Sequence, residues 1–175
     1  MAGAPHLEGR HLGPVASAAQ FERVQALIQS GIDDGARLVC GGVGRPEGRE
    51  YEAGFFCKPT VFADVRPEMA IATEEVFGPV LCIMRFESER DAIELANRTA
   101  YGLTSYVHSA DDERIRRVVP RLRAGMVVVN GVRLGGRAPF GGMRQSGNGR
   151  EGGEWGLREF LEVKAVSGWP APTSR

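Results

Sequence analysis

The stretch YGLTSYVHSADDERIRRVVPRLRAGMVVV, residues 101–129, decides the fold class. Residues 103–108 and 126–129 are short apolar runs rich in β-branched side chains, which favour strands. Between them, residues 111–122 carry apolar side chains at helical spacing behind an acidic start, and Pro120 is a flaw in the interior of that helix. A strand, a helix and a second strand predict parallel pairing, so we expect an α/β fold with a mostly parallel sheet and flanking helices.

Two further helices are marked by the residues at their N-termini. Ser17 is followed three positions later by Gln20, and Ser88 is followed by Asp91, which is the spacing of a capping box. Apolar side chains at helical spacing follow both serines, and glycines within residues 31–35 are expected to end the first helix.

Three stretches between these helices have the composition of strands. Residues 38–40 form a short apolar run that predicts a buried strand. Residues 55–65 are extended in character, and Pro59 within them suggests an edge or a bulge. Residues 80–86 are a further apolar run, so strands and helices alternate along most of the chain.

The pattern changes after Asn130. Residues 131–153 carry nine glycines and little periodicity, and a long loop of this kind is more often functional than idle. Residues 147–152 satisfy the spacing G-x-G-x-x-G, but no strand precedes them, so we do not interpret them as a dinucleotide-binding turn. A short helix is expected near residues 155–158 and a terminal strand over residues 160–166.

The composition argues against several classes of partner. Lys+Arg and Asp+Glu both total 22, and a net charge near zero argues against binding of nucleic acid. No apolar run approaches the roughly 20 residues that span a bilayer, so no membrane partner is expected, and the first 14 residues lack the apolar core of a secretory signal. The histidines are dispersed and lack metal-ligand spacing, so no metal site is expected.

The cysteines Cys40, Cys57 and Cys82 are odd in number and form no C-x-x-C pair. This favours a reducing compartment, so we expect a cytoplasmic protein without a disulfide framework. Each thiol lies among strand-forming residues, and a buried, inert side chain is expected for all three.

Three segments of the chain resemble one enzyme family. They are EEVFGPV at residues 74–80, PFGGMRQSGNGRE at residues 139–151 and EVK at residues 162–164. Shorter pieces, among them residues 12–15 and 101–103, occur in the same order and at similar separations. Together they resemble the NAD(P)-dependent aldehyde dehydrogenases, from about residue 11 to residue 168.

The resemblance implies boundaries and a chemistry. The chain would comprise an N-terminal extension (1–11), the C-terminal part of the aldehyde dehydrogenase catalytic domain (12–158), an oligomerisation strand (159–168) and a tail (169–175). In this family a cysteine thiolate attacks the aldehyde, hydride passes to NAD or NADP, and water hydrolyses the thioester. The nucleophile, its general base and the Rossmann domain precede the part that this chain resembles, and no cysteine here stands in the family's Gly-Gln-x-Cys context. We therefore expect the chain to lack the attacking group.

The resemblance places two residues at the cofactor. Glu75 matches the family glutamate that hydrogen-bonds the nicotinamide ribose, because a carboxylate can accept from both ribose hydroxyls. The alternative is a solvated acidic pair with Glu74. Phe77 matches an aromatic residue that packs beside the nicotinamide ring, and its alternative is a core phenylalanine.

Further residues are matched to the substrate side and to the subunit interface. Phe140 matches an aromatic residue of the substrate tunnel, or else packs inside its loop, and Leu134 falls near a variable tunnel position. Glu151 matches a buried glutamate proposed to relay protons, with a structural ion pair as the competing interpretation. Arg150 and Glu162 match a pair that braces the active-site loop, and we predict a salt bridge between them, within one chain or across two.

Three hypotheses follow for the function. In the first, the chain is part of a working aldehyde dehydrogenase, with an aldehyde substrate and either a second copy or an upstream half as its protein partner. In the second, it is a catalytically inactive truncated product or a dimerisation module, whose terminal strand adds to another chain. An unrelated α/β binding module is the third, and the ordered motifs disfavour it.

Overall fold

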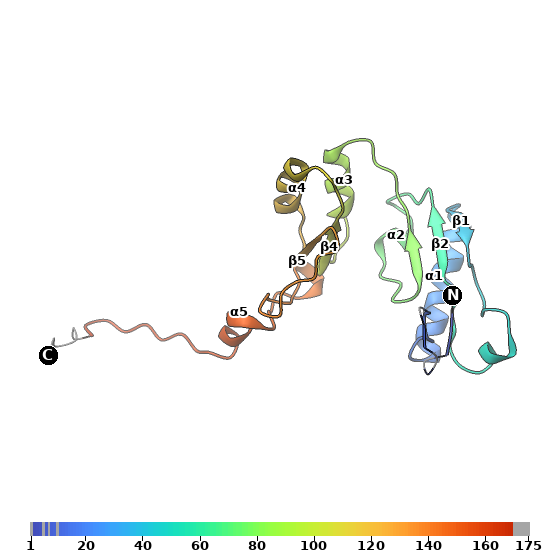
Figure 1. Cartoon of the computed structure of the whole chain (residues 1–175), viewed down its shortest axis with the longest axis horizontal. Helices are drawn as coiled ribbons and strands as arrows, with labels where there is room; N and C mark the ends of the chain where they lie inside the picture. Colours follow the sequence, from blue (N-terminus) through green and yellow to red (C-terminus); the bar gives the residue numbers. More distant parts are fainter. Residues whose placement is uncertain (1, 5, 7, 10, 170–175) are drawn as a thin grey trace. The chain divides into compact units, whose positions relative to one another are not determined.

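The computed structural model describes residues 2–4, 6, 8–9 and 11–169, and its chain divides into two compact units, Met1–Ala100 and Tyr101–Arg175 (Figure 1). This division, at residue 100, falls inside residues 12–158, which were expected to form one segment. Each unit is described by itself. No helix of the described residues is long and apolar enough to cross a bilayer.

The first unit begins with helix α1, Ala18–Asp33. The hydroxyl of Ser17 accepts a hydrogen bond from the backbone N–H of Gln20 at 3.2 Å, which confirms the predicted N-cap. The helix ends before Gly35, whose φ of 83° is a conformation that glycine adopts without strain. Val24, Leu27 and Ile28 form its buried face, at the spacing of an amphipathic helix.

A three-stranded sheet packs in the same unit, in the order β1-β2-β3. Its strands are β1 (Arg37–Cys40), β2 (Thr60–Ala63) and β3 (Val80–Cys82). The β1–β2 pair is antiparallel and the β2–β3 pair is parallel. The short helix η1 (Arg49–Tyr51) lies between β1 and β2 in sequence, and α2 (Ala70–Thr73) lies between β2 and β3. Helix α3 (Glu89–Ala96) follows the sheet. Ser88 accepts from the N–H of Asp91 at 3.1 Å, so the second predicted cap is confirmed.

Two predictions about these strands were wrong. Residues 38–40 do form a strand, but all four residues of β1 are exposed, because β1 lies at the edge of the sheet. Pro59 marks neither an edge strand nor a bulge. It immediately precedes the central strand β2, a position where no ladder N–H is needed, and the register shift lies opposite, between Leu38 and Cys40.

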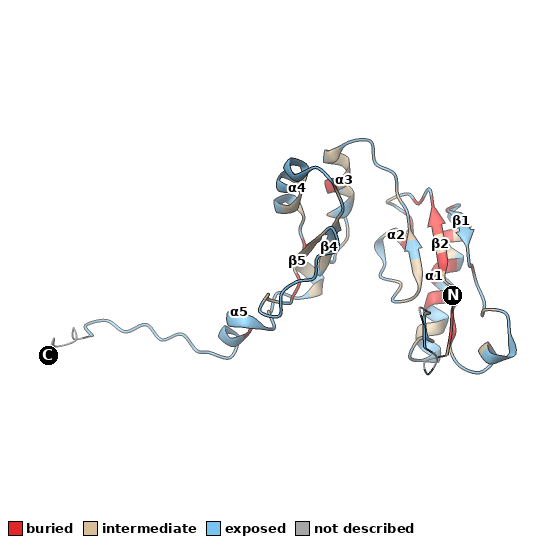
Figure 2. Ribbon diagram, in the orientation of Figure 1, coloured by how far each residue is buried: buried red, intermediate tan, exposed pale blue. Residues whose placement is uncertain are grey.

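The hydrophobic core lies in the first unit, where α1 covers β2. Val24, Ile28 and Phe62 are fully buried, and Cys57 and Ile71 join the same cluster. Figure 2 shows these buried segments in red along α1 and β2. The core fixes the position of the chain from α2 to β3, which contains the predicted cofactor residues.

The second unit is built on a parallel pair of strands, as residues 101–129 predicted. β4 (Thr104–Val107) pairs with β5 (Met126–Val129), with Thr104 opposite Met126. Helix α4 (Asp112–Val118) connects them and is capped by the Asp111 side chain. The α-helix ends before Pro120, which lies in the 3-10 turn η2 (Val119–Arg121). The turn η3 (Arg144–Ser146) and helix α5 (Gly153–Arg158) follow in the glycine-rich region.

The terminal strand predicted over residues 160–166 does not form in the single chain. Residues 161–169 have no regular secondary structure, and Val163 is 99% exposed. An isolated strand leaves its backbone N–H and C=O groups without partners, so it needs another strand beside it. Residues 170–175, the predicted tail apart from Trp169, lie outside the described residues.

Candidate active site

The segment between α2 and β3 holds the two predicted cofactor residues in a strained, exposed conformation. Phe77 has φ 54°, in the left-handed region that residues with a Cβ rarely adopt. Its side chain is 71% exposed, so it is not a core phenylalanine. Gly78 follows, and a Cβ there would lie 2.6 Å from a methyl carbon of Val24, so only glycine fits this close to α1. Strain combined with an exposed aromatic ring is typical of a binding site.

The two adjacent glutamates differ in their partners. Glu74 Oε2 forms an ion pair with Arg23 Nη2 at 3.5 Å, and the same nitrogen donates to the backbone carbonyl of Glu75 at 3.2 Å. The carboxylate of Glu75 is exposed and has no hydrogen bond or ion pair within the described part of the chain. Glu75 is therefore available to a ligand, whereas Glu74 is occupied within the fold.

Helix α1 contributes residues to this segment that the sequence analysis missed. Gln20 Nε2 donates to the carbonyl of Phe77 at 2.6 Å, and Arg23 reaches the carbonyl of Glu75. Gln20 was assigned only to the helix cap, and Arg23 was not singled out. The contacts join positions more than 50 residues apart, so no local spacing signals them.

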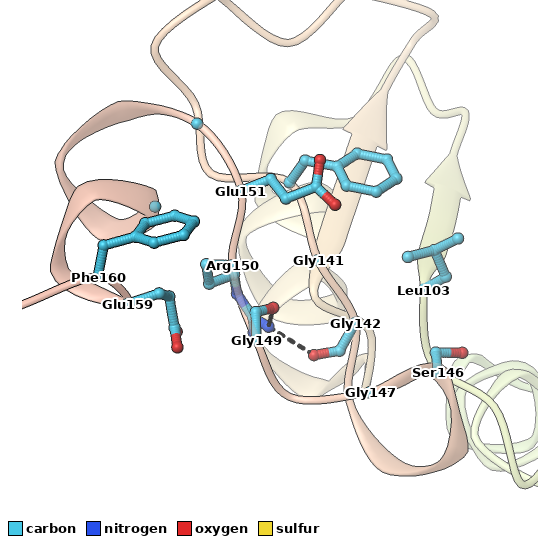
Figure 3. Close-up of a pocket in the computed structure, with 13 residues that line it drawn as sticks. Leu103, Gly141, Gly142, Ser146, Gly147, Gly149, Arg150, Glu151, Glu159 and Phe160 are labelled. Carbon is cyan, nitrogen blue, oxygen red and sulfur yellow. Dashed lines mark hydrogen bonds between the residues drawn. The ribbon is translucent and has the colours of Figure 1, made fainter.

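The second unit contains a half-open pocket of about 460 Å³ in the glycine-rich region (Figure 3). Phe140 and Glu151 form an isolated antiparallel bridge in its wall, with N–H to carbonyl distances of 2.8 and 2.7 Å. The bridge holds two predicted site residues side by side. The pocket is lined by Leu103, Phe140, Gly141, Gly142, Ser146, Gly147, Gly149, Arg150, Glu151, Gly152, Gly156, Glu159 and Phe160.

Glu151 is exposed in this chain, so the expectation of a buried glutamate was wrong for the chain by itself. Its backbone is fixed by the bridge to Phe140, but its side chain faces a pocket that nothing in the described chain closes (Figure 3). The competing structural ion pair does not form among the described residues either.

Arg150 holds the glycine-rich loop through backbone contacts. Its Nη1 donates to the carbonyls of Gly142 at 2.7 Å, Gly149 at 2.9 Å and Asn148 at 3.1 Å, and the first of these is drawn in Figure 3. The predicted salt bridge with Glu162 does not form within the described chain. Its form across two chains stays a prediction.

Leu134 lies outside the pocket, on a loop that starts at Asn130. The side chain of Leu134 is 45% exposed. Asn130 has φ 50°, and its amide both accepts from the backbone N–H of Ser109 and donates to the Ser109 carbonyl, each at 3.0 Å. The start of the loop is therefore fixed, while its tip presents Leu134 to solvent.

The aldehyde dehydrogenase family model matches residues 1–166. The chain belongs to the aldehyde dehydrogenase family. The match includes the first eleven residues, which the sequence analysis had set apart as an extension. The predicted fold, which is the α/β architecture of part of an aldehyde dehydrogenase, is likewise confirmed by solved structures of the family.

Several aldehyde dehydrogenases are similar to the chain over most of its length. The 3-succinoylsemialdehyde-pyridine dehydrogenase of a Pseudomonas species is 52% identical over 95% of this chain and 35% of that protein. The crystal structure of the Bartonella henselae enzyme has a TM-score of 0.91 at 52% identity, covering 96% of this chain and 35% of that one. A mutant aldehyde dehydrogenase C of Pseudomonas syringae, crystallised with NAD+ and octanal, has a TM-score of 0.91 at 50% identity, covering 98% and 35%. The chain thus spans about a third of the length of these aldehyde dehydrogenases.

The three thiols of this aldehyde dehydrogenase chain differ in environment. Burial raises the pKa of Cys57 above its ordinary value, against weaker opposing effects of Gln25 and Arg45, and burial also raises the pKa of Cys82. Both thiols stay protonated near neutral pH and fit the predicted inert role. Cys40 is exposed at the end of the edge strand β1, so the prediction of burial was wrong there. Within the described residues, no group of three or more acidic, histidine or cysteine side chains could hold a metal ion.

Proposed function

We propose that this chain supplies the C-terminal part of the active site of an NAD(P)-dependent aldehyde dehydrogenase, which oxidises an aldehyde to a carboxylic acid through a cysteine thioester. One observation carries the proposal. Glu74 is paired, whereas the adjacent carboxylate of Glu75 is exposed and has no hydrogen bond or ion pair with any described residue, next to the strained and exposed Phe77. A carboxylate held out in this way fits the two hydroxyl groups of a ribose.

The residues of this chain bind and orient in that reaction. When bound, NAD(P) accepts the hydride that leaves the aldehyde carbon. Glu75 accepts hydrogen bonds from the ribose, and Phe77 packs beside the nicotinamide ring. Phe140 and Leu134 contact the aldehyde chain, and Glu151 takes up the proton released when water hydrolyses the thioester. The nucleophilic cysteine and its general base come from an upstream part of the enzyme.

Exposed apolar side chains support a protein partner. Trp155 is 58% exposed, Phe160 is 87% exposed and Leu161 is 59% exposed. Several large apolar side chains exposed close together in sequence favour a surface that binds another protein. We assign residues 159–168 to strand addition onto a second copy, where Glu162 would meet Arg150. The upstream part of the enzyme would cover the pocket around Glu151, and we place the assembled protein in the cytoplasm.

Complementation tests this proposal. The chain is co-expressed with the first two-thirds of the 3-succinoylsemialdehyde-pyridine dehydrogenase, and aldehyde-dependent NAD(P)H formation is followed by absorbance. We expect activity from the assembled pair, none from either part, and a loss with Glu75→Gln. Co-purification of the two parts without activity would favour the inactive module, and activity of the chain alone would disprove the upstream nucleophile.

A further inference from the structure

We propose that Gln20 and Arg23 are positioning residues, which hold the backbone of residues 74–79 from the first turns of α1 and thereby set the geometry of the cofactor site. The inference rests on the proposed function. Neither side chain needs to touch the cofactor. Each instead donates a hydrogen bond to the backbone carbonyl of a residue that we assign to cofactor binding. Gln20 Nε2 lies 2.6 Å from Phe77 O, and Arg23 Nη2 lies 3.2 Å from Glu75 O.

The segment needs such support because its own conformation is unfavourable. Phe77 has φ 54°, which persists only where the surroundings over-determine it. Val76, between the two cofactor residues, packs against the core, whereas Glu75 and Phe77 are exposed. The core therefore anchors the middle of the segment, and the two donors of α1 fix the carbonyls on either side.

The Gln20 amide is held at both ends. Its Oε1 accepts from the backbone N–H of Ala16 at 3.0 Å, while its Nε2 reaches Phe77 O. The helix start and the cofactor segment are thus connected through one planar group. The backbone N–H of Gln20 is itself capped by Ser17, so the capping serine also orients the residue that holds Phe77.

Arg23 lies three residues after Gln20, on the same face of the helix. Its Nη2 is shared between the carboxylate of Glu74 and the carbonyl of Glu75. This contact accounts for the difference between the two adjacent glutamates among the residues that the structure describes. Arg23 engages Glu74 and the Glu75 backbone, which leaves the Glu75 carboxylate to a ligand.

The substitution Gln20→Glu separates the two contacts of the amide. A carboxylate still accepts from the Ala16 N–H and suits the first turn of a helix, but it cannot donate to Phe77 O. The matched control is Gln29→Glu, the same change on the same helix, where the Gln29 side chain contacts only Asp33 within the described residues.

The first measurement uses the 175-residue chain without cofactor. Hydrogen exchange of the amides of Val80, which donates to Gly78 O, and Thr60, which donates to Pro79 O, should be about tenfold faster in Gln20→Glu than in wild type. Amides in the middle of α1 should keep their rates. Gln29→Glu should leave the segment unchanged. Unaltered exchange at Val80 and Thr60 would overturn the inference, and so would faster exchange along all of α1, which indicates a capping role only.

The second measurement uses the complemented enzyme. The dissociation constant of NAD+ should rise about tenfold in Gln20→Glu, with the KM for the aldehyde unchanged. Arg23→Lys, which keeps a donor, should affect NAD+ binding less than Arg23→Met. A wild-type assembly that binds no NAD+ refutes the proposed function, whereas NAD+ binding that is equal in wild type and Gln20→Glu refutes the positioning role.

Discussion

The two units bury their apolar side chains to very different extents. In Met1–Ala100, α1 and the three-stranded sheet enclose a core around Phe62, which is fully buried. Among the described residues of Tyr101–Arg175, the buried hydrophobic side chains are those of Ala124 and Met126. The second unit instead exposes large side chains, with Tyr106 at 68% and Phe160 at 87%.

This difference indicates two sources of stability. The first unit has enough internal packing to fix its candidate site, because the cofactor segment is held by its own helix α1. The second unit fixes its glycine-rich region by backbone contacts and by Arg150, but its described residues bury few hydrophobic side chains beneath that region. The chain spans about a third of the length of its relatives, so the two units can be compared only by the packing of their own described residues.

The largest expected effect comes from removing the centre of the first core. Phe62→Ala should lower the free energy of unfolding of the first unit by about 3–5 kcal/mol, because a fully buried aromatic ring leaves a cavity. The control Phe86→Ala, at a side chain that is 60% exposed, should change it by less than about 0.5 kcal/mol. Urea denaturation measures both. Similar losses in the two variants would show that the first unit has no cooperative core of its own.

A smaller effect is expected in the second unit, where the backbone at Gly125 lies in close contact with the backbone of the glycine-rich loop. A Cβ at Gly125 would collide with the carbonyl oxygen of Gly141, so Gly125→Ala forces the β4–β5 pair and the glycine-rich loop apart. We expect a loss of about 1–3 kcal/mol, seen as faster hydrogen exchange at residues 104–107 and 126–129. Gly135→Ala, with nothing within 4 Å of the added carbon, is the matched control. Equal protection in both variants would contradict the tight backbone contact.

Local patterns predicted the elements of both units well. The caps at Ser17 and Ser88 and the parallel β4–β5 pair depend on neighbouring residues, so the sequence contains the information needed to place them. Pro120 was expected inside a helix, whereas α4 ends before it, at Val118. Burial was harder to predict. Residues 38–40 and Cys40 have core composition but lie on an edge strand, and strand order depends on contacts that are distant in sequence.

The candidate site was predictable where the family motifs reach it. Glu75, Phe77 and Phe140 lie within quoted motifs, and the structure gives them exposed side chains. Motifs do not reveal that Arg23 pairs with the carboxylate of Glu74 and not with that of Glu75. Arg23 lies on α1, about 50 residues before the two glutamates, so no local pattern signals the contact. Motifs also did not predict that Glu151 is exposed or that residues 160–166 form no strand in the described chain.

The smallest expected effect concerns charge at the edge of the first unit. Asp64, at φ 55°, accepts from Arg37 Nε at 2.7 Å and pairs with Arg85 Nε at 3.2 Å. The hydrogen bond from Arg37, with the charges of Arg37 and Arg85, lowers the pKa of Asp64 below its ordinary value. A carboxyl group with a lowered folded-state pKa stabilises the fold above its unfolded-state value, and that contribution disappears as the pH falls through the folded-state value.

Stability of the wild-type first unit should therefore decline below about pH 4, and Asp64→Asn should flatten part of that decline, measured by urea midpoints from pH 2 to pH 7. Asparagine tolerates the left-handed backbone, so the variant removes charge without adding strain. High salt should shrink the difference between wild type and Asp64→Asn, because both arginines are exposed and their field is screened. Parallel pH profiles for wild type and Asp64→Asn would mean that the pairs of Asp64 with Arg37 and Arg85 contribute nothing to the free energy of unfolding.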